Sequence, residues 1–509
     1  MGFAVMLCRA QQGMEAPEVR VEVNVGKGLP SFQIIGMPET TVREAKDRVR
    51  TAIQNSGIPF PVAKITVNLS PAELPKQGAR FDLAIALGIL AAEEEWTLPT
   101  EPLEYYGELA LNGCIQHVPG LLPALVQGQK HNRAAMIPAE NKAEAALLQK
   151  AKVYALDNLS QAIAHVTGME KQTPLKPQAI TPKPQTQANL SDVHGQALAK
   201  RALVIAASGG HHVLFVGPPG TGKTMLAKRL IGLLPLLNEE EALEVAAIKS
   251  LTGQPFNLAD WRHRPFRAPH HSCSGTALVG GGSIPKPGEI SLSSNGLIFL
   301  DELTEIPRHI LDTLREPMES GEVHISRAKM QATFPAKFQF IGALNPSPCG
   351  HFDGSLSSAR ATPDQILKYL GRISGPFLDR IDLQVEVPRQ PDALKRSSER
   401  TIAPEDTSEY WAERVATAHG KQLQRQNCLN SALKGKELDN YCALSEKDHD
   451  YLVTAMEKLQ LSHRAYHRTL RLARTIADLE GSHAIERMHI TEAMSYRALD
   501  NLLNRLKEF

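Results

Sequence analysis

Gly217-Pro-Pro-Gly-Thr-Gly-Lys-Thr224 is the stretch from which the fold of this chain can be worked out. An apolar run, HHVLFV, precedes it, and KTMLAKRLIGLL, with apolar residues at helical spacing, overlaps its end. A phosphate-binding loop needs this order of strand, turn and helix, because glycines let backbone N–H groups surround phosphate oxygens and the helix N-terminus favours an anion. The sequence therefore predicts an ATP site. Its expected cofactor-binding residues are Gly217, Pro218, Pro219, Gly220, Thr221, Gly222, Lys223 and Thr224.

A second element, the acidic end of an apolar strand, supplies the groups for hydrolysis. The run LIFL ends in Asp301 and Glu302. Lys223 is expected to reach the β- and γ-phosphates, while Thr224 and Asp301 hold Mg²⁺. Glu302 is expected to polarise the attacking water, since phosphoryl transfer needs an oriented nucleophile. Such an adjacent acidic pair is typical of nucleotide hydrolases rather than of proteins that only bind nucleotides.

Three further polar residues complete the predicted catalytic set. A strand over 338–345 ends in Asn345, whose amide could help to position the water. Arg380, in GPFLDRID, and Arg464, in LSHR, offer guanidinium groups of the kind that stabilise a transferring phosphoryl group. A lone arginine is more often a surface or salt-bridged residue. The assignment of both arginines therefore depends on the surrounding motifs.

Composition limits the class of protein. The chain has 509 residues, of which 42% are hydrophobic and 22% charged, so it should fold into about three globular domains. Its 56 basic and 55 acidic side chains give a formal net charge of +1. No overall field attracts nucleic acid or an anionic membrane, and any such binding must use local patches. The first residues show neither a membrane span nor a cleavable signal, and the six cysteines are scattered. We therefore expect a cytoplasmic protein without a membrane partner.

Three domains and a linker are expected along the chain. KQTPLKPQAITPKPQTQAN is rich in proline, lysine and glutamine, as a semi-rigid linker is. Before it, alternating apolar runs and one apolar helix predict a two-layer α+β domain. After it, buried-strand runs alternate with helices, which predicts a parallel α/β sheet, and the last part is helical. The predicted boundaries are residues 1–170, 171–190 for the linker, 191–390 and 391–509.

The five polar elements, in this order and spacing, look like those of an AAA+ ATPase. Longer segments narrow the resemblance: VREAKDRVRTAIQNSGIPFP, ITVNLSPAELPKQGARFDLAIALGILAA, FRAPHHS, GGGSIPKPGEISLSSNGLIFLDEL and SGPFLDRIDLQVEVP. These resemble the YifB/ComM family of magnesium-chelatase-like AAA+ ATPases nearly end to end. The resemblance implies a multidomain α/β chain with a Lon-protease/ribosomal-S5-like α+β domain, a central AAA+ P-loop α/β domain and a C-terminal α-helical lid.

The same resemblance implies a function. Family members closest in pattern are ring-forming DNA motors that use ATP and Mg²⁺ to branch-migrate recombination intermediates during natural transformation. Arg380 resembles a finger inserted by a neighbouring subunit, and Arg464 resembles the sensor 2 arginine. A finger that acts on a neighbour requires a homo-oligomer, expected to be a hexamer. The residues carried over as the site of a single subunit are Lys223, Thr224, Asp301, Glu302 and Asn345.

The sequence departs from two known patterns, the catalytic residues of Lon-type proteases and the paired cysteines of many family members, and each departure excludes a function. In a Lon-type protease the stretch PKQGAR would carry the nucleophilic serine where Arg80 stands, and the expected lysine position falls on or near Ala124. Without nucleophile and base, acyl transfer cannot start, so proteolysis is not expected. Many family members also carry paired cysteines after the sensor-1 asparagine. Here Cys349 is alone with His351 nearby, and a structural zinc site normally needs four ligands, so no zinc is expected.

DNA contacts are expected on two loops that converge in a ring. The glycine-rich turn GGGSIPKPGE carries Lys286, and a hairpin over EVHISRAKMQATF carries Arg327 and Lys329 at its bend. Repeated around a ring, such cations would follow phosphates without reading bases. The alternative is that they are solvated turn residues. The arginines spaced along RAYHRTLRLAR share one helix face, which fits a solvated face or packing against acids at least as well as DNA contact.

Two other functions remain open. The AAA+ part also resembles a chelatase motor subunit that assists metal insertion, although such subunits are expected to lack the first 170 residues. A protein-remodelling ATPase with the N-terminal domain as adaptor is the other alternative. The expected loops are rich in glycine, lysine and arginine rather than the aromatic residues that usually grip polypeptide, which favours a nucleic-acid track.

Overall fold

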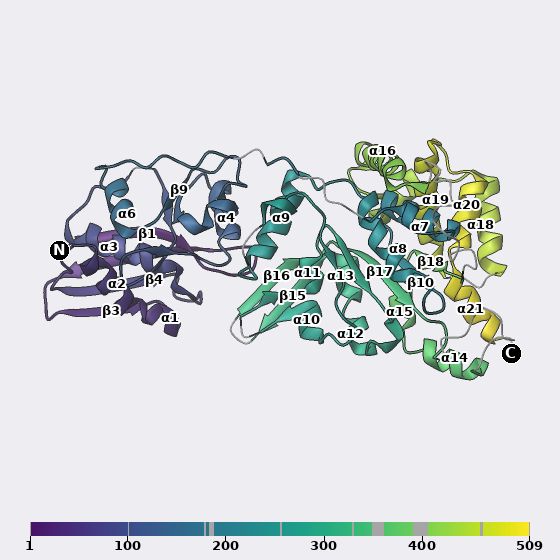
Figure 1. Ribbon diagram of the computed structural model, residues 1–509, viewed down its shortest axis with the longest axis horizontal. Helices are drawn as coiled ribbons and strands as arrows, with labels where there is room; N and C mark the ends of the chain where they lie inside the picture. The colour runs from purple at the N-terminus through teal and green to yellow at the C-terminus, as the bar shows by residue number, and fades with distance from the viewer. Residues whose placement is uncertain are drawn as a thin grey trace.

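Three parts of the molecule follow one another along its longest axis. The computed structural model describes residues 2–99, 101–177, 180–182, 188–254, 257–282, 284–327, 330–348, 361–389, 406–458 and 462–507. Figure 1 shows the N-terminal sheet with its helices at one end, a second sheet in the middle and a group of helices at the other end. The arrangement agrees with the expected succession of α+β, α/β and helical parts.

The N-terminal part is built on one mixed sheet. In spatial order its strands are β3 (Ser31–Ile35), β4 (Lys64–Ser70), β2 (Glu18–Gly26), β1 (Gly2–Arg9), β5 (Leu103–Tyr105), β8 (Ala134–Pro138) and β9 (Val153–Leu156). The pairs β1–β2 and β2–β4 are antiparallel, whereas β5, β8 and β9 run parallel. Alternate residues of β2 and β4 are buried, as their alternating sequences predict.

Helices cover this sheet, and one of them forms the centre of its core. Helix α3 (Asp82–Glu93) is buried through Ala92 because its sequence is apolar on every side. It packs on β1 and β2, and a Cβ placed on Gly88 would lie 2.7 Å from Cγ2 of Val23. The remaining elements here are α1 (Thr40–Arg43), α2 (Ala45–Asn55), α4 (Leu122–Lys130), α5 (Lys142–Ala145), α6 (Leu159–Val166), β6 (Glu108–Leu109) and β7 (Ile115–Gln116).

The central sheet is parallel, as predicted. Its order is β11 (Phe266–Arg267), β14 (Leu297–Leu300), β17 (Gln339–Leu344), β10 (Val213–Val216) and β18 (Leu383–Glu386). Residues of β10, β14 and β17 are buried on both faces, which explains their continuous apolar runs. The helices of this part are α7 (Ala197–Gly209), α8 (Lys223–Leu230), α9 (Glu239–Ser250), α10 (Gly275–Val279), α11 (Glu289–Leu292), α12 (Arg308–Asp312), α13 (Arg315–Ser320), α14 (Pro363–Leu370) and α15 (Gly375–Leu378).

The central part also contains two hairpins. The first pairs β12 (Gly280–Gly281) with β13 (Lys286–Pro287), and the second pairs β15 (Glu322–Arg327) with β16 (Met330–Pro335). The second confirms the hairpin predicted for EVHISRAKMQATF. Figure 1 places β15 and β16 on the side that faces the N-terminal part.

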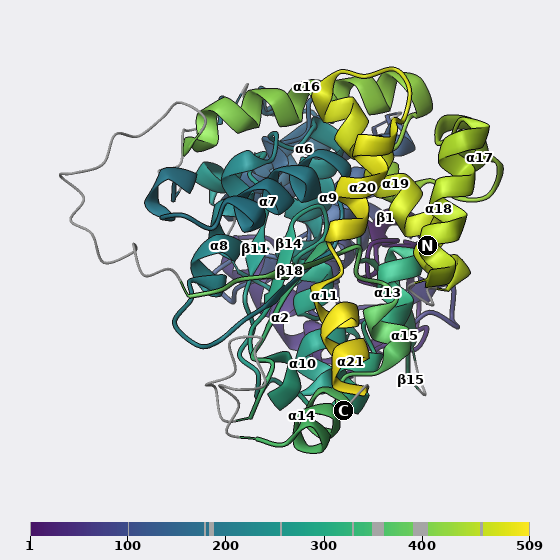
Figure 2. The same cartoon turned by 90° about the vertical axis from the view of Figure 1, so that its right-hand side faces the viewer.

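The C-terminal part is helical, as expected. Its helices are α16 (Ser408–Gln426), α17 (Lys436–Tyr441), α18 (Glu446–Lys458), α19 (His463–Glu480), α20 (Arg487–Ser495) and α21 (Ala498–Lys507). Ser462 caps α19 by accepting a hydrogen bond from the backbone N–H of Ala465, and Gly481 ends that helix at a φ of 81°. In Figure 2, α16, α19 and α20 lie together while α21 continues toward α14, where its leucines join the core of the central part.

The N-terminal and central parts share a packed junction. Helix α9 lies against α4, and Leu237 and Ala246 belong to the same apolar cluster as the N-terminal sheet. The backbone N–H of Gly120 donates to the carbonyl of Ser250 at 3.1 Å. A second contact links the N-terminal part to the β15–β16 hairpin: Nε2 of Gln12 donates to the carbonyl of Gln331 in β16 at 3.1 Å. This hairpin is therefore in contact with the N-terminal domain.

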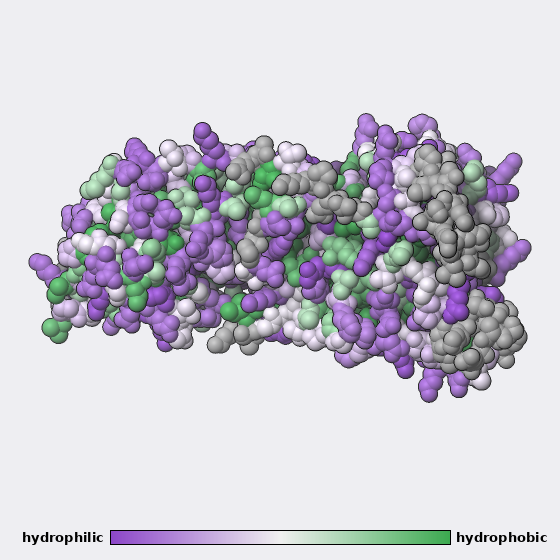
Figure 3. All heavy atoms as spheres, in the orientation of Figure 1, coloured by the Kyte–Doolittle hydropathy of each residue, from purple (hydrophilic) through white to green (hydrophobic). Residues whose placement is uncertain are grey.

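The outer surface is mostly polar. On the face shown in Figure 3, hydrophilic residues dominate and hydrophobic ones gather only in small separate groups. Within the described ranges, no helix combines the length and the apolar character needed to cross a bilayer.

Candidate nucleotide site and cationic loops

The carboxyl ends of three neighbouring strands meet at a cavity of about 390 Å³. The loop 217–222 follows β10, Asp301 follows β14 and Asn345 follows β17, so the parallel sheet brings all three to one edge. The cavity is lined by Pro219, Gly220, Thr221, Gly222, Lys223, Thr224, Met225, Asp301, Glu302 and Asn345. Residues that the motifs predicted separately therefore form one site.

The loop at this cavity has the geometry of an anion cradle. Gly220 and Gly222 have φ angles of 77° and 90°, a region that favours glycine. A Cβ placed on either would meet nothing within 4 Å. Consecutive backbone N–H groups in such conformations form concave anion sites, and α8 begins directly after them. The loop therefore fits a nucleotide phosphate chain.

Lys223 is held inside this loop. Its Nζ donates to the carbonyls of Gly217 at 2.7 Å and Pro218 at 2.8 Å, and to Oδ1 of Asn345 at 3.0 Å. Burial lowers the pKa of Lys223, while the negative charges of Asp301 and Glu302 act in the opposite direction. The ammonium group therefore points to the end of β17 as well as to the loop.

Thr224 and Asp301 form a compact oxygen pair. The hydroxyl of Thr224 donates to Oδ2 of Asp301 at 2.7 Å. Hydroxyl and carboxylate oxygens are ligands that Mg²⁺ accepts, usually together with water and substrate phosphates. The two residues therefore fit a Mg²⁺ bound beside the phosphate loop.

Glu302 stands beside the pair in an unusual backbone conformation. Its φ is 50°, and its backbone N–H donates to Oδ1 of Asp301 at 2.9 Å. The side chain is 49% exposed, and Oε2 lies 3.4 Å from Nδ1 of His271. A non-glycine residue at positive φ costs free energy, so surrounding structure must hold it there. The carboxylate therefore belongs to the cavity lining and is also reached by solvent.

Arg380 lies outside the cavity and contacts its own chain. It follows α15, its Nη2 is 2.6 Å from Oε1 of Glu319, and its Nε donates to the carbonyl of Arg315 at 3.0 Å. Nη1 donates to the carbonyl of Pro376. The side chain is 13% exposed. Arg380 is therefore engaged within the subunit rather than directed at that subunit's own phosphate loop.

Arg464 also lies away from the cavity lining and is exposed on the first turn of α19. One turn further, Arg468 is buried and connects α19 to the segment around Arg380. Its Nη1 donates to the carbonyl of Ile381 at 2.8 Å, and its Nη2 lies 3.3 Å from Oδ1 of Asp379. These contacts place the start of α19 beside the Arg380 segment.

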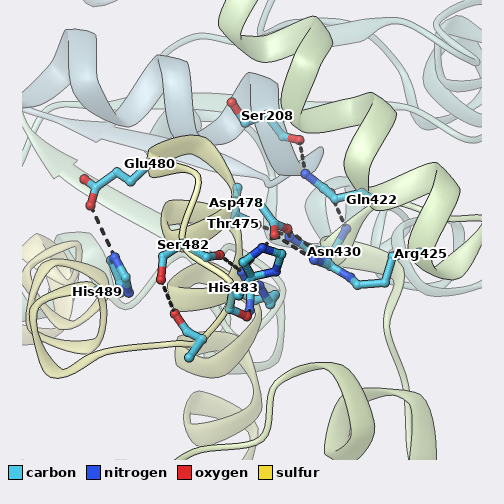
Figure 4. A network of polar contacts seen from close by, with 12 residues as sticks. Ser208, Gln422, Arg425, Asn430, Thr475, Asp478, Glu480, Ser482, His483 and His489 are labelled. Atoms are coloured by element: carbon cyan, nitrogen blue, oxygen red, sulfur yellow. Dashed lines mark hydrogen bonds and ion pairs between the residues drawn. The ribbon is translucent and has the colours of Figure 1, made fainter.

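The rest of the arginine face of α19 is internal. Arg474 is buried and lies 2.9 Å from Oδ1 of Asp478, a carboxylate that also accepts from Arg425 at 2.6 Å. Figure 4 shows Arg425, Asn430 and Asp478 converging between α16 and α19. Of the alternatives left open for this face, packing against acids is therefore correct for Arg468 and Arg474, and neither is available to DNA.

The two predicted cationic loops lie side by side. A Cβ on Gly281 would be 3.0 Å from Nη2 of Arg327, and one on Gly280 would be 2.8 Å from Cδ1 of Ile325. Lys286, which pairs with Gly281, and Arg327 are both exposed. The β12–β13 hairpin and the β15–β16 hairpin, here called the cationic loops, therefore form one joint surface over their described residues.

Some predicted residues fall outside the described part of the chain. Lys329, the third expected DNA contact, lies there, as do Cys349 and His351, on which the zinc prediction rests. Within the described ranges, no group of three or more histidine, cysteine, aspartate or glutamate side chains is placed to hold a metal ion.

The position that would carry a protease nucleophile is filled by a buried cation. Arg80 is 4% exposed and donates through Nη2 to Oε1 of Gln11 at 2.7 Å and to the carbonyl of Pro119 at 2.9 Å. Ala124 is buried on α4, the helix that meets α9. The region around Arg80 and Ala124 thus lies next to the junction with the central part.

Sequence reasoning missed two residues at the candidate site. His271 belongs to the segment FRAPHHS, whose two adjacent histidines come shortly after β11, the short strand next to β14. That position was a usable sign. The role of Glu319 could not be predicted from the sequence, because its contact with Arg380 depends on how α13 and α15 pack together.

The fold and this cavity define an AAA+-like ATPase module of the magnesium-chelatase type. Models described as "Magnesium chelatase, subunit ChlI" and "Magnesium chelatase, subunit ChlI C-terminal" match residues 189–394 and 405–497. A model described as "Subunit ChlI of Mg-chelatase" matches residues 21–141.

Relatives that align over nearly the whole chain identify the family to which it belongs. "Competence protein ComM" of Haemophilus influenzae is 47% identical over 99% of both chains. "Uncharacterized protein YifB" of Salmonella typhimurium is 48% identical over 100% of this chain and 99% of that protein. "Magnesium-chelatase 38 kDa subunit" of Cereibacter sphaeroides is 26% identical over 60% of this chain and 91% of that protein. The chain belongs to the YifB/ComM family of magnesium-chelatase-like proteins.

Proposed function

We propose that this protein is an ATP-driven, ring-forming DNA motor that promotes branch migration of recombination intermediates during natural transformation. The observation that carries the proposal is the joint cationic surface, because Lys286 and Arg327 come together on the same module as the nucleotide cavity. The similarity to a protein named for competence supports the biological setting.

Hydrolysis is assigned to residues that the cavity brings together. The phosphate loop and Lys223 hold the phosphates, Thr224 and Asp301 hold Mg²⁺, and Glu302 orients the attacking water. Bound Mg²⁺ neutralises charge on the phosphates. Asn345 restrains Lys223 and faces the same space, so it is placed to position the water.

Two arginines are proposed to act on the neighbouring subunit. Arg380 and Arg464 are absent from the lining of their own subunit's cavity, and Arg468 ties the segments that carry them together. In a ring, both guanidinium groups would face the next subunit's nucleotide, where they stabilise charge on the transferring group. Arg380 then exchanges its ion pair with Glu319 for a phosphate. Oligomerisation, as a hexamer, is part of this proposal.

A chelatase-type motor subunit is the second candidate. Residues 21–141 match a model described as a chelatase subunit. The presence of an N-terminal domain therefore distinguishes this chain from chelatase subunits less clearly than the sequence analysis expected. The extent of the similarity favours the DNA motor, because the chelatase subunit aligns with 60% of this chain whereas ComM aligns with 99%. A protein-remodelling ATPase is the remaining alternative.

ATP hydrolysis tests the proposal. The purified protein is assayed without DNA, with single strands and with a four-way junction, with Glu302→Gln as the inactive control. DNA is expected to stimulate hydrolysis, the stimulation should weaken as salt is raised, and the control should lack it. Hydrolysis that no DNA changes, at low salt and at concentrations where the ring forms, would reject the DNA motor in favour of protein remodelling or metal insertion.

A further inference from the structure

Arg80, at the position where a Lon-type protease would carry its nucleophile, joins two loops of the N-terminal part. Its Nη2 donates to Oε1 of Gln11 at 2.7 Å and to the carbonyl of Pro119 at 2.9 Å. Gln11 lies in the loop 10–17, which follows β1, and Pro119 lies in the loop 117–121, which precedes α4. One side chain therefore connects both loops.

Arginine is a costly residue at this buried position. Both acceptors of its Nη2 are neutral oxygens, one from a side-chain amide and one from the backbone. Burial lowers the pKa of Arg80, because a charge is less stable away from water. A buried cation held by neutral groups costs free energy that an apolar side chain would not. The connection between the two loops is therefore what distinguishes arginine from an apolar residue here.

Both loops contact the central part. The backbone N–H of Gly120 donates to the carbonyl of Ser250, the last residue of α9, at 3.1 Å. Nε2 of Gln12 donates to the carbonyl of Gln331 in β16 at 3.1 Å. Gly120 and Gln12 each directly follow an acceptor of Arg80. Arg80 therefore acts next to both points at which these loops meet the central part.

The loop after β1 packs closely on the β15–β16 hairpin, which lies on the side facing the N-terminal part (Figure 1). A Cβ placed on Gly13 would lie 3.3 Å from Cβ of Ala332. Within the hairpin Arg327 pairs with Met330, so the contact at Gln331 is one residue away from the partner of that arginine. The N-terminal part therefore holds the hairpin close to its proposed DNA-contacting cation.

We propose that Arg80 is a positioning residue that fixes the β15–β16 hairpin on the N-terminal part, so that Arg327 is presented to DNA in one orientation. This inference rests on the proposed function. The hairpin is a sheet of only two strands, and contact with a folded domain limits the orientations that it can take. A cation that is already held in place loses less conformational freedom when it binds a phosphate. Arg80 thus raises DNA affinity without touching DNA.

Arg80→Met tests this role, because methionine fills much of the same space without the hydrogen bonds. Hydrogen exchange of the backbone amides of 118–122 and 330–335 should become about threefold faster or more. Affinity for single-stranded DNA should fall about threefold or more, with ATP affinity unchanged. Arg48→Met, which removes the partner of Asp82 elsewhere in the same domain, is the matched control and should keep native hairpin exchange and DNA affinity. Unchanged hairpin exchange or unchanged DNA affinity in Arg80→Met overturns the proposal.

Gln12→Ala interrupts the contact with the hairpin from outside the core, so it tests the proposal even if Arg80→Met fails to fold. It should speed exchange in the hairpin and weaken DNA binding about twofold or more, since one hydrogen bond is lost. Gln54→Ala, at an exposed glutamine of α2, should behave as the native chain. Native exchange in the hairpin of Gln12→Ala would contradict the contact.

A disulfide separates positioning from stability. Gly13→Cys with Ala332→Cys joins residues whose Cβ atoms lie close to the spacing found in disulfides. In the Arg80→Met background, the oxidised crosslink should return DNA affinity to within about twofold of the crosslinked chain that keeps Arg80, and reduction should abolish the recovery. Cysteines that do not crosslink in the chain with Arg80, or a crosslink that leaves DNA affinity low, would contradict the positioning role.

Exchange and crosslinking need no DNA, which separates this inference from the proposed function. If the native chain binds no DNA at low salt, the DNA motor fails, yet faster hairpin exchange in Arg80→Met would still show that Arg80 holds the hairpin. If the native chain and Arg80→Met bind DNA equally well, the motor stands and the positioning role falls.

Discussion

Lys223 has its donors occupied by acceptors of its own subunit. Two are loop carbonyls and the third is the amide of Asn345. An incoming phosphate must replace at least one of them, and a charged hydrogen bond to phosphate is stronger than one to a neutral carbonyl. Nucleotide binding therefore reorganises the contact between the loop and the end of β17.

Two substitutions should separate binding from turnover. Lys223→Ala is expected to weaken ATP binding about 10- to 100-fold, because it removes a charged hydrogen-bond donor. Glu302→Gln should leave affinity within about twofold but lower kcat about 100-fold or more, since it removes the group that polarises water. Titration with a fluorescent ATP analogue and steady-state hydrolysis measure the two effects. Equal losses of affinity in both variants would be inconsistent with these roles.

Residues of one subunit's site could be predicted from the sequence, whereas the contacts of the arginines could not. Asp301, Glu302 and Asn345 directly follow apolar strands, and parallel strands place their ends together whatever the rest of the chain does. The spacing of the α19 arginines showed that they share a face. It could not show that Asp379 lies opposite that face, or that Arg425 shares the carboxylate of Asp478, because those contacts depend on packing between distant segments.

At the scale of elements, the cationic loops should set DNA affinity. Lys286→Ala combined with Arg327→Ala is expected to weaken binding of single strands and to lower the slope of log affinity against log salt by about one for each phosphate that is no longer neutralised. ATP affinity without DNA should not change. Lys150→Ala, at an exposed lysine of the N-terminal part, serves as control. A double variant with native DNA affinity and salt slope would place the DNA elsewhere.

The junction between the N-terminal and central parts contains an acid in an apolar setting. Glu144 of α5 is 4% exposed, and its Oε2 accepts from Oγ of Ser250 at 3.2 Å. Burial raises the pKa of Glu144 from 4.5 to about 7, although hydrogen bonds from Ser250 and Asn141 act against the increase. The folded chain therefore favours the protonated acid.

Glu144→Gln should change how stability depends on pH. An acid with a raised pKa in the folded state stabilises the fold fully below its unfolded pKa, and that contribution is lost as the pH rises through the folded value. The variant should match the native chain near pH 4.5 and become more stable by up to about 3 kcal/mol above pH 7. Thermal unfolding across this pH range measures the difference. A difference that does not grow between pH 4.5 and 7 would exclude Glu144 as its source.

The junction itself could not be expected from the sequence. The proline-rich segment indicated separate domains, yet Leu175 and Ile180 pack against the N-terminal core, and α9 adds residues to that core. Single elements such as α3, β10 and β14 were predictable, because the apolar pattern within each segment is enough to indicate a buried helix or strand. The packing of α9 on α4 depends on the fit between two helix surfaces, and the sequence pattern of neither helix shows that they meet.

At the scale of the whole molecule, neighbouring subunits should complete each other's sites. Arg380→Ala alone should keep ATP affinity but lower kcat about 1,000-fold or more, as loss of an arginine finger does. Mixing Arg380→Ala with Glu302→Gln should recover activity, since one subunit then supplies Glu302 and its neighbour supplies Arg380. Mixing Lys223→Ala with Glu302→Gln should not, because both residues belong to one subunit's site. Recovery in neither mixture would exclude Arg380 as a residue that acts between subunits.

ATP-driven movement of a labelled four-way junction through homologous arms, followed by fluorescence as the strands separate, tests the proposed DNA motor directly. The native chain is expected to convert the junction to duplex products when ATP and Mg²⁺ are present. Glu302→Gln should bind the junction without converting it, and the double substitution at Lys286 and Arg327 should convert it more slowly. Conversion equal in the native chain and in Glu302→Gln, or none by a native chain that hydrolyses ATP and binds the junction, would contradict the proposed motor.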